Sequence, residues 1–231
     1  MKYRFRFTLK LKLLLGFGML GILLLVMYRT MSSTQDANSM RASENSELLF
    51  PSMLYTEKLK DLIENSQHLT TKWTLKGEPK DGKLLGEIES CHGELYDSLK
   101  AQIVKFVDKD LWSDKNKELY FQVTSIVDTL FALQDDIVDN LNTIEKFNDK
   151  SNYSFRRYSV VEGEEVACYK RAYNAATRLA NSFQKESSGQ LETMLEGFEK
   201  SDSALKWGIF VFFVCLVLIF LLLNHNLRKL N

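Results

Sequence analysis

Proline and glycine are scarce in this chain. There are two prolines, Pro51 and Pro79, and 11 glycines in 231 residues. Both residue types usually mark the turns between short strands, because proline fixes the backbone and glycine frees it. The sequence also has no alternating runs of β-branched residues bounded by turn signals. We therefore exclude an all-β fold and expect helices.

Histidine and cysteine, three residues each, are too few and too scattered to form an obvious catalytic set. His68 and His92 lie at similar distances from Pro79, so two antiparallel helices could bring them together as weak zinc ligands. The alternative, which we favour, places His92 in a core layer and His68 on the surface. We expect no enzyme, no cofactor and no nucleic-acid partner.

The cysteines leave two possibilities open. Cys91 and Cys168 would face an oxidising compartment, where disulfides persist. Their helices are expected to be diagonal, however, and bridged Cα atoms must lie within about 7 Å. We favour free thiols over a bond, and a packing role for Cys215.

Long apolar runs stand at both ends, at residues 13–28 and 207–223. A helix needs about 20 apolar residues to cross a bilayer, and flanking lysines can extend these runs by snorkelling. A cleaved signal peptide is the alternative for the first run, but no small-residue cleavage site follows it. The expected organisation is a basic tail 1–12, a transmembrane helix 13–29, an outer domain 30–206, a transmembrane helix 207–223 and a stub 224–231.

The first apolar run contains Gly16, Gly18 and Gly21, which match a dinucleotide-binding spacing. That site also needs a preceding strand and a later acidic residue, and both are missing here. Small residues on a membrane helix more often permit close helix contact. We interpret the three glycines as a packing surface, at best a dimer face.

Apolar residues recur at three- and four-residue steps through the outer domain, which indicates amphipathic helices. Turn signals at residues 77–82, a Ser113-Asp114 cap and a polar connection at 148–163 divide them into four. Near-heptad spacing is typical of a bundle. The fold prediction is all-α: an antiparallel up-down-up-down four-helix bundle whose first and last helices continue into the two membrane helices. The four stripes are Tyr55, Leu59, Leu62, Leu69, Trp73; Leu85, Ile88, His92, Leu95, Leu99, Ile103, Phe106; Leu119, Val123, Ile126, Leu130, Leu133, Ile137, Leu141, Ile144; and Tyr169, Tyr173, Ala176, Ala180, Phe183, resuming at Leu191, Met194 and Phe198.

Two stretches carry a resemblance to a known family. Residues 8–20, TLKLKLLLGFGML, and Pro51 within LLFPSML resemble the first membrane helix and the early sensor domain of methyl-accepting chemotaxis receptors and HAMP-linked bacterial sensor kinases. The resemblance implies a homodimeric inner-membrane receptor with a periplasmic sensor bundle and a cytoplasmic HAMP or kinase partner. After Leu223 the chain has only eight residues, which stop before the usual HAMP proline. It is then either the input half of a longer protein or an output-less receptor.

Ligand capture is the remaining chemistry. We predict a small anionic ligand held weakly by residues on or after the 148–163 connection: Arg156, Arg157, Arg171, Arg178, Tyr169 and Tyr173. The alternative is a solvated face, and we interpret Asp135, Asp136 and Asp139 as such a face.

Two function classes follow. One is a sensory input module that passes a helix displacement through Ser203, Lys206 and Trp207 into the second span. The other is a membrane-anchored scaffold that acts by bundle assembly.

Charge predicts the topology. The two chain ends, before the first apolar run and after the second, together carry seven basic residues and no Asp or Glu. All acidic residues lie between the two runs. Cytoplasmic flanks are enriched in Lys and Arg, so both termini should be cytoplasmic and residues 30–206 outside.

A reporter fused after Asn231 should be active only in the cytoplasm, and one inserted at Asn152 only outside. The reverse activity at either position would overturn this topology.

Overall fold

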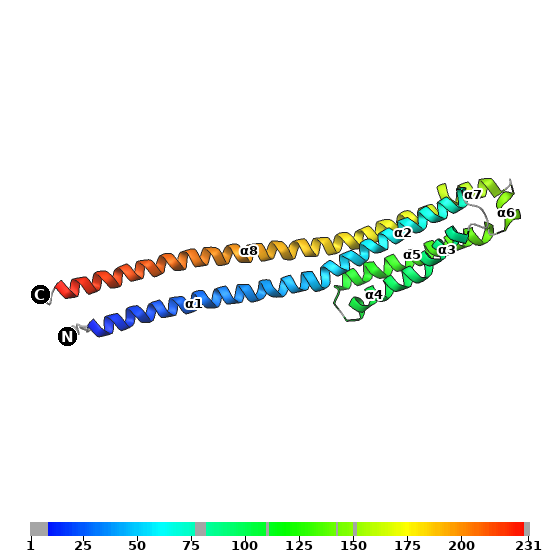
Figure 1. The fold of residues 1–231 in the computed structure, drawn as a ribbon. Helices are drawn as coiled ribbons and strands as arrows, with labels where there is room; N and C mark the ends of the chain where they lie inside the picture. Colours follow the sequence, from blue (N-terminus) through cyan, green and yellow to red (C-terminus); the bar gives the residue numbers. More distant parts are fainter. Residues whose placement is uncertain (1–8, 77–81, 110, 142, 150–151, 229–231) are drawn as a thin grey trace. The chain divides into compact units, whose positions relative to one another are not determined.

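The computed structural model describes residues 9–76, 82–109, 111–141, 143–149 and 152–228. Throughout these ranges every regular element is helical (Figure 1), which confirms the all-α class. The four-helix bundle and its continuation into membrane helices stay predictions. The elements are α1 Leu9–Glu44, η1 Asn45–Leu49, α2 Phe50–Lys76, α3 Gly82–Ser90, η2 Cys91–Leu95, α4 Tyr96–Asp108, α5 Asp114–Leu141, α6 Ile144–Asn148, α7 Asn152–Val161 and α8 Glu164–Arg228, where η marks a π-helical turn.

The chain divides into two compact units. The terminal unit comprises Met1–Ser43 and Gly189–Asn231, and the central unit comprises Glu44–Ser188. Residues 30–43 and 189–206, which the sequence assigns to the outer domain, therefore belong to the terminal unit.

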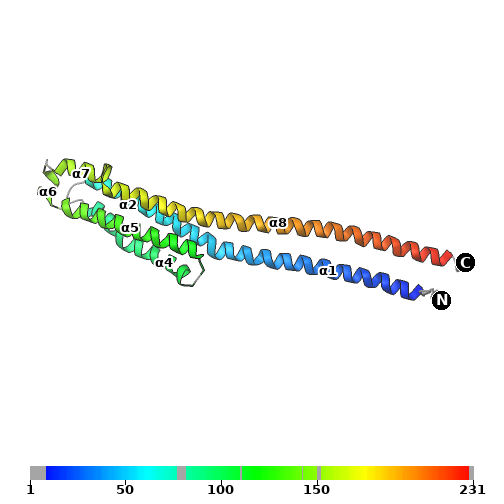
Figure 2. The ribbon, with the colours of Figure 1, turned by 180° about the vertical axis from the view of Figure 1, so that it is seen from behind.

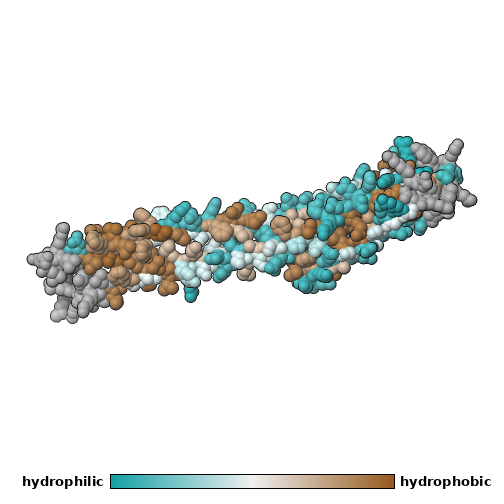
Figure 3. All heavy atoms as spheres, in the orientation of Figure 1, coloured by the Kyte–Doolittle hydropathy of each residue, from teal (hydrophilic) through white to brown (hydrophobic). Residues whose placement is uncertain are grey.

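The terminal unit consists of α1 and the C-terminal part of α8, which run side by side in both views (Figures 1 and 2). Among the residues that the structure describes, two helices are long and apolar enough to cross a membrane, by length and composition. In Figure 3, hydrophobic residues cover the face of this unit near the chain ends, and hydrophilic residues are mixed with them farther from the ends. Phe17, Phe213 and Phe220 are among the many large apolar side chains that are more than half exposed. A surface of this kind is typical of contact with lipid or with another apolar partner.

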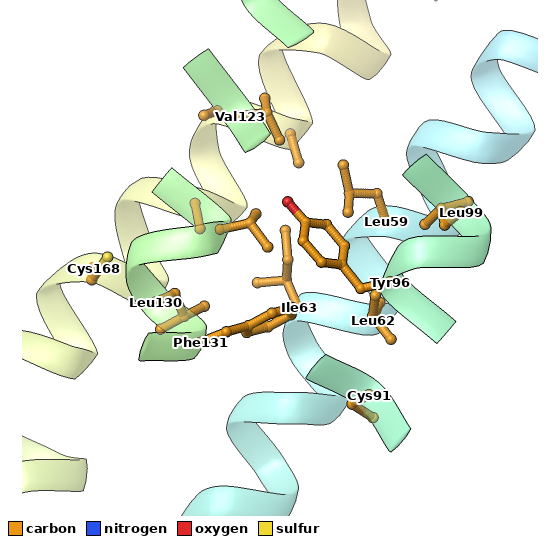
Figure 4. Packing of buried hydrophobic residues seen from close by; sticks show 14 of the residues in the cluster. Leu59, Leu62, Ile63, Cys91, Tyr96, Leu99, Val123, Leu130, Phe131 and Cys168 are labelled. Atoms are coloured by element: carbon orange, nitrogen blue, oxygen red, sulfur yellow. The ribbon is translucent and has the colours of Figure 1, made fainter. Parts of the chain in front are cut away.

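The central unit has an apolar core. Most of its members come from α2, from the α3–η2–α4 segment, from α5 and from the first part of α8. Figure 4 shows Ile63, Tyr96 and Phe131 pointing toward one another between three of these helices. Near one end, Trp112 packs edge-on against Tyr120 and Phe183. The core therefore joins residues far apart in the sequence.

Most of the predicted stripe positions that the structure describes are buried or half-buried, but three are not. Leu95 is 49% exposed, and Leu191 and Phe198 are exposed within the terminal unit. Leu95 ends the π turn η2, and a π turn adds a residue to the helical turn, which shifts the register of the inward face. Tyr96, 3% exposed, fills the core position that the spacing assigned to Leu95.

A second π turn, η1, ends two residues before Pro51. Proline lacks the backbone N–H that would bond the carbonyl four residues earlier. The wider turn next to Pro51 accommodates this missing donor within an otherwise helical stretch. The predicted single helix over 30–76 is thus α1, η1 and α2 in succession.

The predicted turns have different outcomes. Ser113 Oγ accepts a hydrogen bond from the Asn116 N–H, so Ser113 caps α5 as predicted. The predicted turn at 77–82 lies largely outside the described residues. The predicted polar connection at 148–163 is wrong in part, because α7 occupies Asn152–Val161. Val160 is buried there, which gives α7 an apolar contact that polar composition did not indicate.

Candidate functional site

A layer of polar side chains interrupts the core of the central unit. Ser66 and Gln67 come from α2, His92 from η2, Gln134 from α5 and Glu165 from the first turn of α8. Ser66 and Gln134 are 0% exposed and Glu165 is 2% exposed. We call these five residues the polar layer. Burying such groups is unfavourable unless each finds hydrogen-bond partners.

Gln134 is the centre of the layer. Its amide nitrogen donates to Glu165 Oε1 at 2.8 Å and to Gln67 Oε1 at 3.3 Å. Its amide oxygen accepts from the Ser66 hydroxyl and lies 2.9 Å from His92 Nε2. Gln134 therefore links α2, η2 and α8 through one side chain.

His92 joins this centre to solvent. Its Nδ1 lies 2.7 Å from Asp135 Oδ1, and the two side chains are 7% and 58% exposed. The imidazole stacks on the Phe131 ring with centroids 4.3 Å apart. Asp135, predicted to lie on a solvated face, thus also fixes His92. Because the Asp135 carboxylate can only accept a hydrogen bond, His92 must carry a hydrogen on Nδ1.

Glu165 is the buried acid of the layer. Burial raises the pKa of its carboxyl, and the amide donors Gln134 and Gln67 oppose this rise. Gln67 Nε2 lies 3.2 Å from Glu165 Oε2, so both carboxyl oxygens have amide partners. Its raised pKa marks Glu165 as a group that can gain a proton more readily than an exposed glutamate.

The layer contains the contacts of a serine, histidine and aspartate triad. Ser66 Oγ lies 2.8 Å from His92 Nε2, and His92 Nδ1 lies against Asp135. Acyl transfer also needs substrate access and free backbone donors for the oxyanion. Ser66 is fully buried within α2, where helical hydrogen bonds occupy the backbone N–H groups. The chemistry that this geometry supports is proton and hydrogen-bond exchange.

Cys91 and Cys168 are buried free thiols. Cys91 accepts a hydrogen bond from Asn65 Nδ2 at 3.4 Å, and Cys168 Sγ lies 3.6 Å from the Ile126 carbonyl oxygen. Burial raises the pKa of both thiols, which disfavours the reactive thiolate. Both residues act here as small core side chains.

The predicted ligand residues fall into two groups. The Arg156 guanidinium donates to the Thr74 carbonyl from Nε and Nη2, at 2.8 and 2.6 Å, and to the Phe147 carbonyl from Nη1 at 3.1 Å. Arg157, Arg171 and Arg178 are exposed. Arg156 therefore ties α2, α6 and α7 together, and ligand binding by the other arginines stays a prediction.

The predicted tyrosines lie on α8. The Tyr169 and Tyr173 rings are 6.1 Å apart, and Lys60 Nζ lies 5.6 Å from the Tyr173 ring centre. Both tyrosines are half-buried and so present part of each ring to solvent. They form a partly open aromatic wall next to a cation.

The weak metal candidates are not arranged as ligands. His68 is exposed, and His92 belongs to the polar layer. In the described part of the chain, no group of three or more His, Cys, Asp or Glu side chains could hold a metal ion. A separate groove of about 450 Å³ is lined by residues of α2 and α4, which include Lys58, Asp61 and Gln102. Its size falls in the range of small-molecule sites.

The predicted packing glycines do not share one role. A Cβ on Gly16 would lie 3.1 Å from the Ile219 side chain of α8, whereas Gly18 and Gly21 have open space. Gly16 thus serves contact within the chain, and only the other two glycines present an open face.

The residues predicted to transmit a signal lie on α8. Lys206 Nζ pairs with Asp202 Oδ2 at 2.6 Å, and Trp207 packs edge-on against Phe210. Ser203 is exposed.

Polar residues at inward-facing positions are the signal in the sequence that indicates the polar layer. The stripe of α2 passes from Leu62 to Leu69 and skips the inward position at Ser66. Gln134 lies four residues after Leu130 and three before Ile137, beside Leu133 of the stripe, and so also faces inward. Polar residues at inward positions of two helices indicate a shared buried layer, but their matching heights become visible only in the folded chain.

Arg156 and Arg157 provide a test of structural against surface roles. Arg156→Met should destabilise the chain by about 1–3 kcal/mol, because the Thr74 and Phe147 carbonyls lose charged donors. Arg157→Met should change the free energy of unfolding by no more than about 0.5 kcal/mol, since that side chain is exposed. Urea unfolding of the full chain, followed by tryptophan fluorescence, measures both. Equal effects would contradict the structural role of Arg156.

Comparisons with known proteins do not assign the chain to a family. No protein-family model matches it, and neither a curated protein nor a solved structure matches significantly.

Proposed function

We propose that the chain is a membrane-anchored sensory input module of a bacterial cytoplasmic membrane. Residues 30–206 form an extracytoplasmic four-helix bundle whose helices are α1–α2, α3–α4, α5 and α8. This bundle binds a small ligand or a partner outside. The signal passes through α8 into the membrane and on to a cytoplasmic HAMP or kinase partner.

One observation carries this proposal: the single helix α8 contributes both to the core of the central unit and to the second predicted membrane span. Its residues Ala172 and Phe183 are fully buried in the core of the central unit. The same helix, Glu164–Arg228, contains the apolar residues 207–223. A single helix can carry a displacement along its axis, because every residue is bonded to the next turn.

Ligand capture by this module rests on exposed charge. Arg157, Arg171 and Arg178 are free of the main-chain bonds that hold Arg156. Guanidinium groups bind carboxylates bidentately, and Tyr169 and Tyr173 add aromatic surface. These groups support a small anionic ligand as the first class to test.

A scaffold function is the second candidate, and the exposed apolar surface of the terminal unit favours it. Large apolar side chains such as Leu195 and Phe198 lie on α8 outside the predicted span. An assembly partner would cover such residues. A scaffold would not need α8 to transmit rotation, and this difference separates the two functions.

Insertions in α8 test signal transmission without a known ligand. Residues 1–228 are fused to the HAMP and kinase-control module of a characterised chemoreceptor, and one to four alanines are inserted after Ser203. Each inserted residue rotates the following helix by about 100°, so kinase output should vary with a period of about 3.6 residues. Ser203→Pro should make output insensitive, because proline breaks the helix at a cost of about 3 kcal/mol.

Ser203→Ala is the matched control and should leave output unchanged. Expression and helix content of each variant are checked by immunoblotting and circular dichroism. Output that is flat across all four insertions in folded protein would favour the scaffold.

A parallel homodimer is part of the proposal. The face of α1 that points away from α8 should cross-link between subunits when single cysteines replace its residues in a background free of native cysteines. Asn38 is the inward control, because its side chain is 4% exposed and donates to the Met194 carbonyl. Cross-links at Asn38 equal to those on the outer face, or none anywhere, would contradict the dimer. The exposed test positions are Ser33, Asp36, Met40 and Ser43.

A further inference from the structure

Two contacts of the Gln134 amide, beside those with the Ser66 hydroxyl and the Gln67 amide, set a proton requirement. One end of the amide faces His92 Nε2 at 2.9 Å, and the other faces Glu165 Oε1 at 2.8 Å. An amide has a donor end and an acceptor end, so its two neighbours must have complementary roles. Two orientations of the amide have to be considered, since its oxygen and nitrogen can exchange by a 180° turn.

In the first orientation the amide oxygen faces His92. The Nε2 atom must then carry a hydrogen, while Nδ1 carries another toward Asp135. His92 is therefore the doubly protonated imidazolium. The amide nitrogen donates to Glu165, which is an ionised carboxylate.

In the second orientation the amide nitrogen faces His92 and donates to a bare Nε2. The amide oxygen then faces Glu165 Oε1, and only a protonated carboxyl can donate to it. His92 is neutral and Glu165 is neutral. The proton has moved from one end of the amide to the other, and the total is unchanged.

We propose that the polar layer is a binding site for one proton, shared between His92 and Glu165, and that the orientation of the Gln134 amide follows from which of the two residues holds it. Without this proton, neither orientation satisfies both short contacts, because one of them joins two acceptors. Such a contact between buried groups weakens the packing of α2, η2, α5 and α8. The central unit is then a proton-responsive element.

The surroundings of the layer fit this site. Asp135 of α5 accepts from Nδ1 in both states, and 58% of its side chain is exposed to solvent. From α2, Ser66 and Gln67 contribute uncharged groups, and His68 is exposed. On α8, Glu165 is the buried acid and its neighbour Glu164 is exposed. Burial raises the pKa of Glu165, which favours the state with the proton on its carboxyl.

The direction of the pH dependence follows from proton counts. In an unfolded chain, ordinary histidine and glutamate side chains are both deprotonated above about pH 6.5. The folded layer keeps one proton at that pH, so the folded state binds more protons than the unfolded state. Stability then falls as the pH rises, by about tenfold in the ratio of folded to unfolded chain per pH unit, until the folded layer also loses its proton.

The test measures unfolding of the full chain in lipid nanodiscs. Trp207→Phe leaves Trp73 and Trp112, both buried in the central unit, as the fluorescent probes. Urea unfolding from pH 6.0 to 8.5 should show the tenfold loss per pH unit above about pH 6.5. Glu165→Gln should remove this slope, because the introduced amide can donate or accept without a proton.

Glu164→Gln is the matched control, since it removes the same charge from the adjacent, exposed position. It should keep the slope of the parent protein, as should His68→Gln. A parent stability that does not change between pH 6.5 and 8.5, or equal slopes for the two glutamate variants, would overturn the proposal.

Nitrogen NMR of His92 gives a second test that does not depend on a core substitution. His68→Gln and His225→Gln leave His92 as the only labelled histidine. At pH 6.5 the spectrum should show imidazolium, the Nδ1–H tautomer, or both in exchange. The Nε2–H tautomer as the main species would overturn the proposal, because its bare Nδ1 would face the Asp135 carboxylate.

Discussion

Hydrogen bonding of the buried Gln134 amide is the constraint on which the central unit depends. A buried amide left without partners costs about 1–3 kcal/mol, a large fraction of the stability of an ordinary domain. Its partners come from three other helical segments, so they must stand at one height for all contacts to form. Apolar packing tolerates small shifts, whereas this amide does not. The polar layer thus sets the register of α2, η2, α5 and α8.

The π turn η2 is the local feature that places His92 in this layer. Leu99 and Ile103 follow the predicted spacing, whereas Leu95 leaves the core and Tyr96 enters it. In a regular α-helix without the extra residue of the π turn, the side chains before and after this point would not face the same side of the helix. The wide turn therefore reconciles an inward His92 with an inward Tyr96, and both pack against Phe131.

Sequence reasoning predicted what depends on periodicity and local chemistry. The helical class, most stripe positions and the Ser113 cap follow from spacing and residue type. It failed at α7, whose formation depends on contacts such as those of Arg156 with the ends of other helices. It also did not predict that the residues of the polar layer meet, because the relative heights of Ser66, Gln134 and Glu165 along the helices depend on loop lengths and π turns. The ligand site predicted at the arginines depends on side-chain positions that spacing alone does not fix.

The position of Glu165 in the first turn of α8 places two opposing effects on its proton. Burial favours the neutral acid, while the positive end of a helix dipole favours the carboxylate by about 0.3–1 kcal/mol. The two amide donors add to the second effect. Because these effects on the Glu165 carboxyl oppose each other, a small change in its surroundings can move the proton between Glu165 and His92. Since α8 is also the helix of the proposed signal path, a proton shift at its first turn acts directly on the element that the receptor function requires to move.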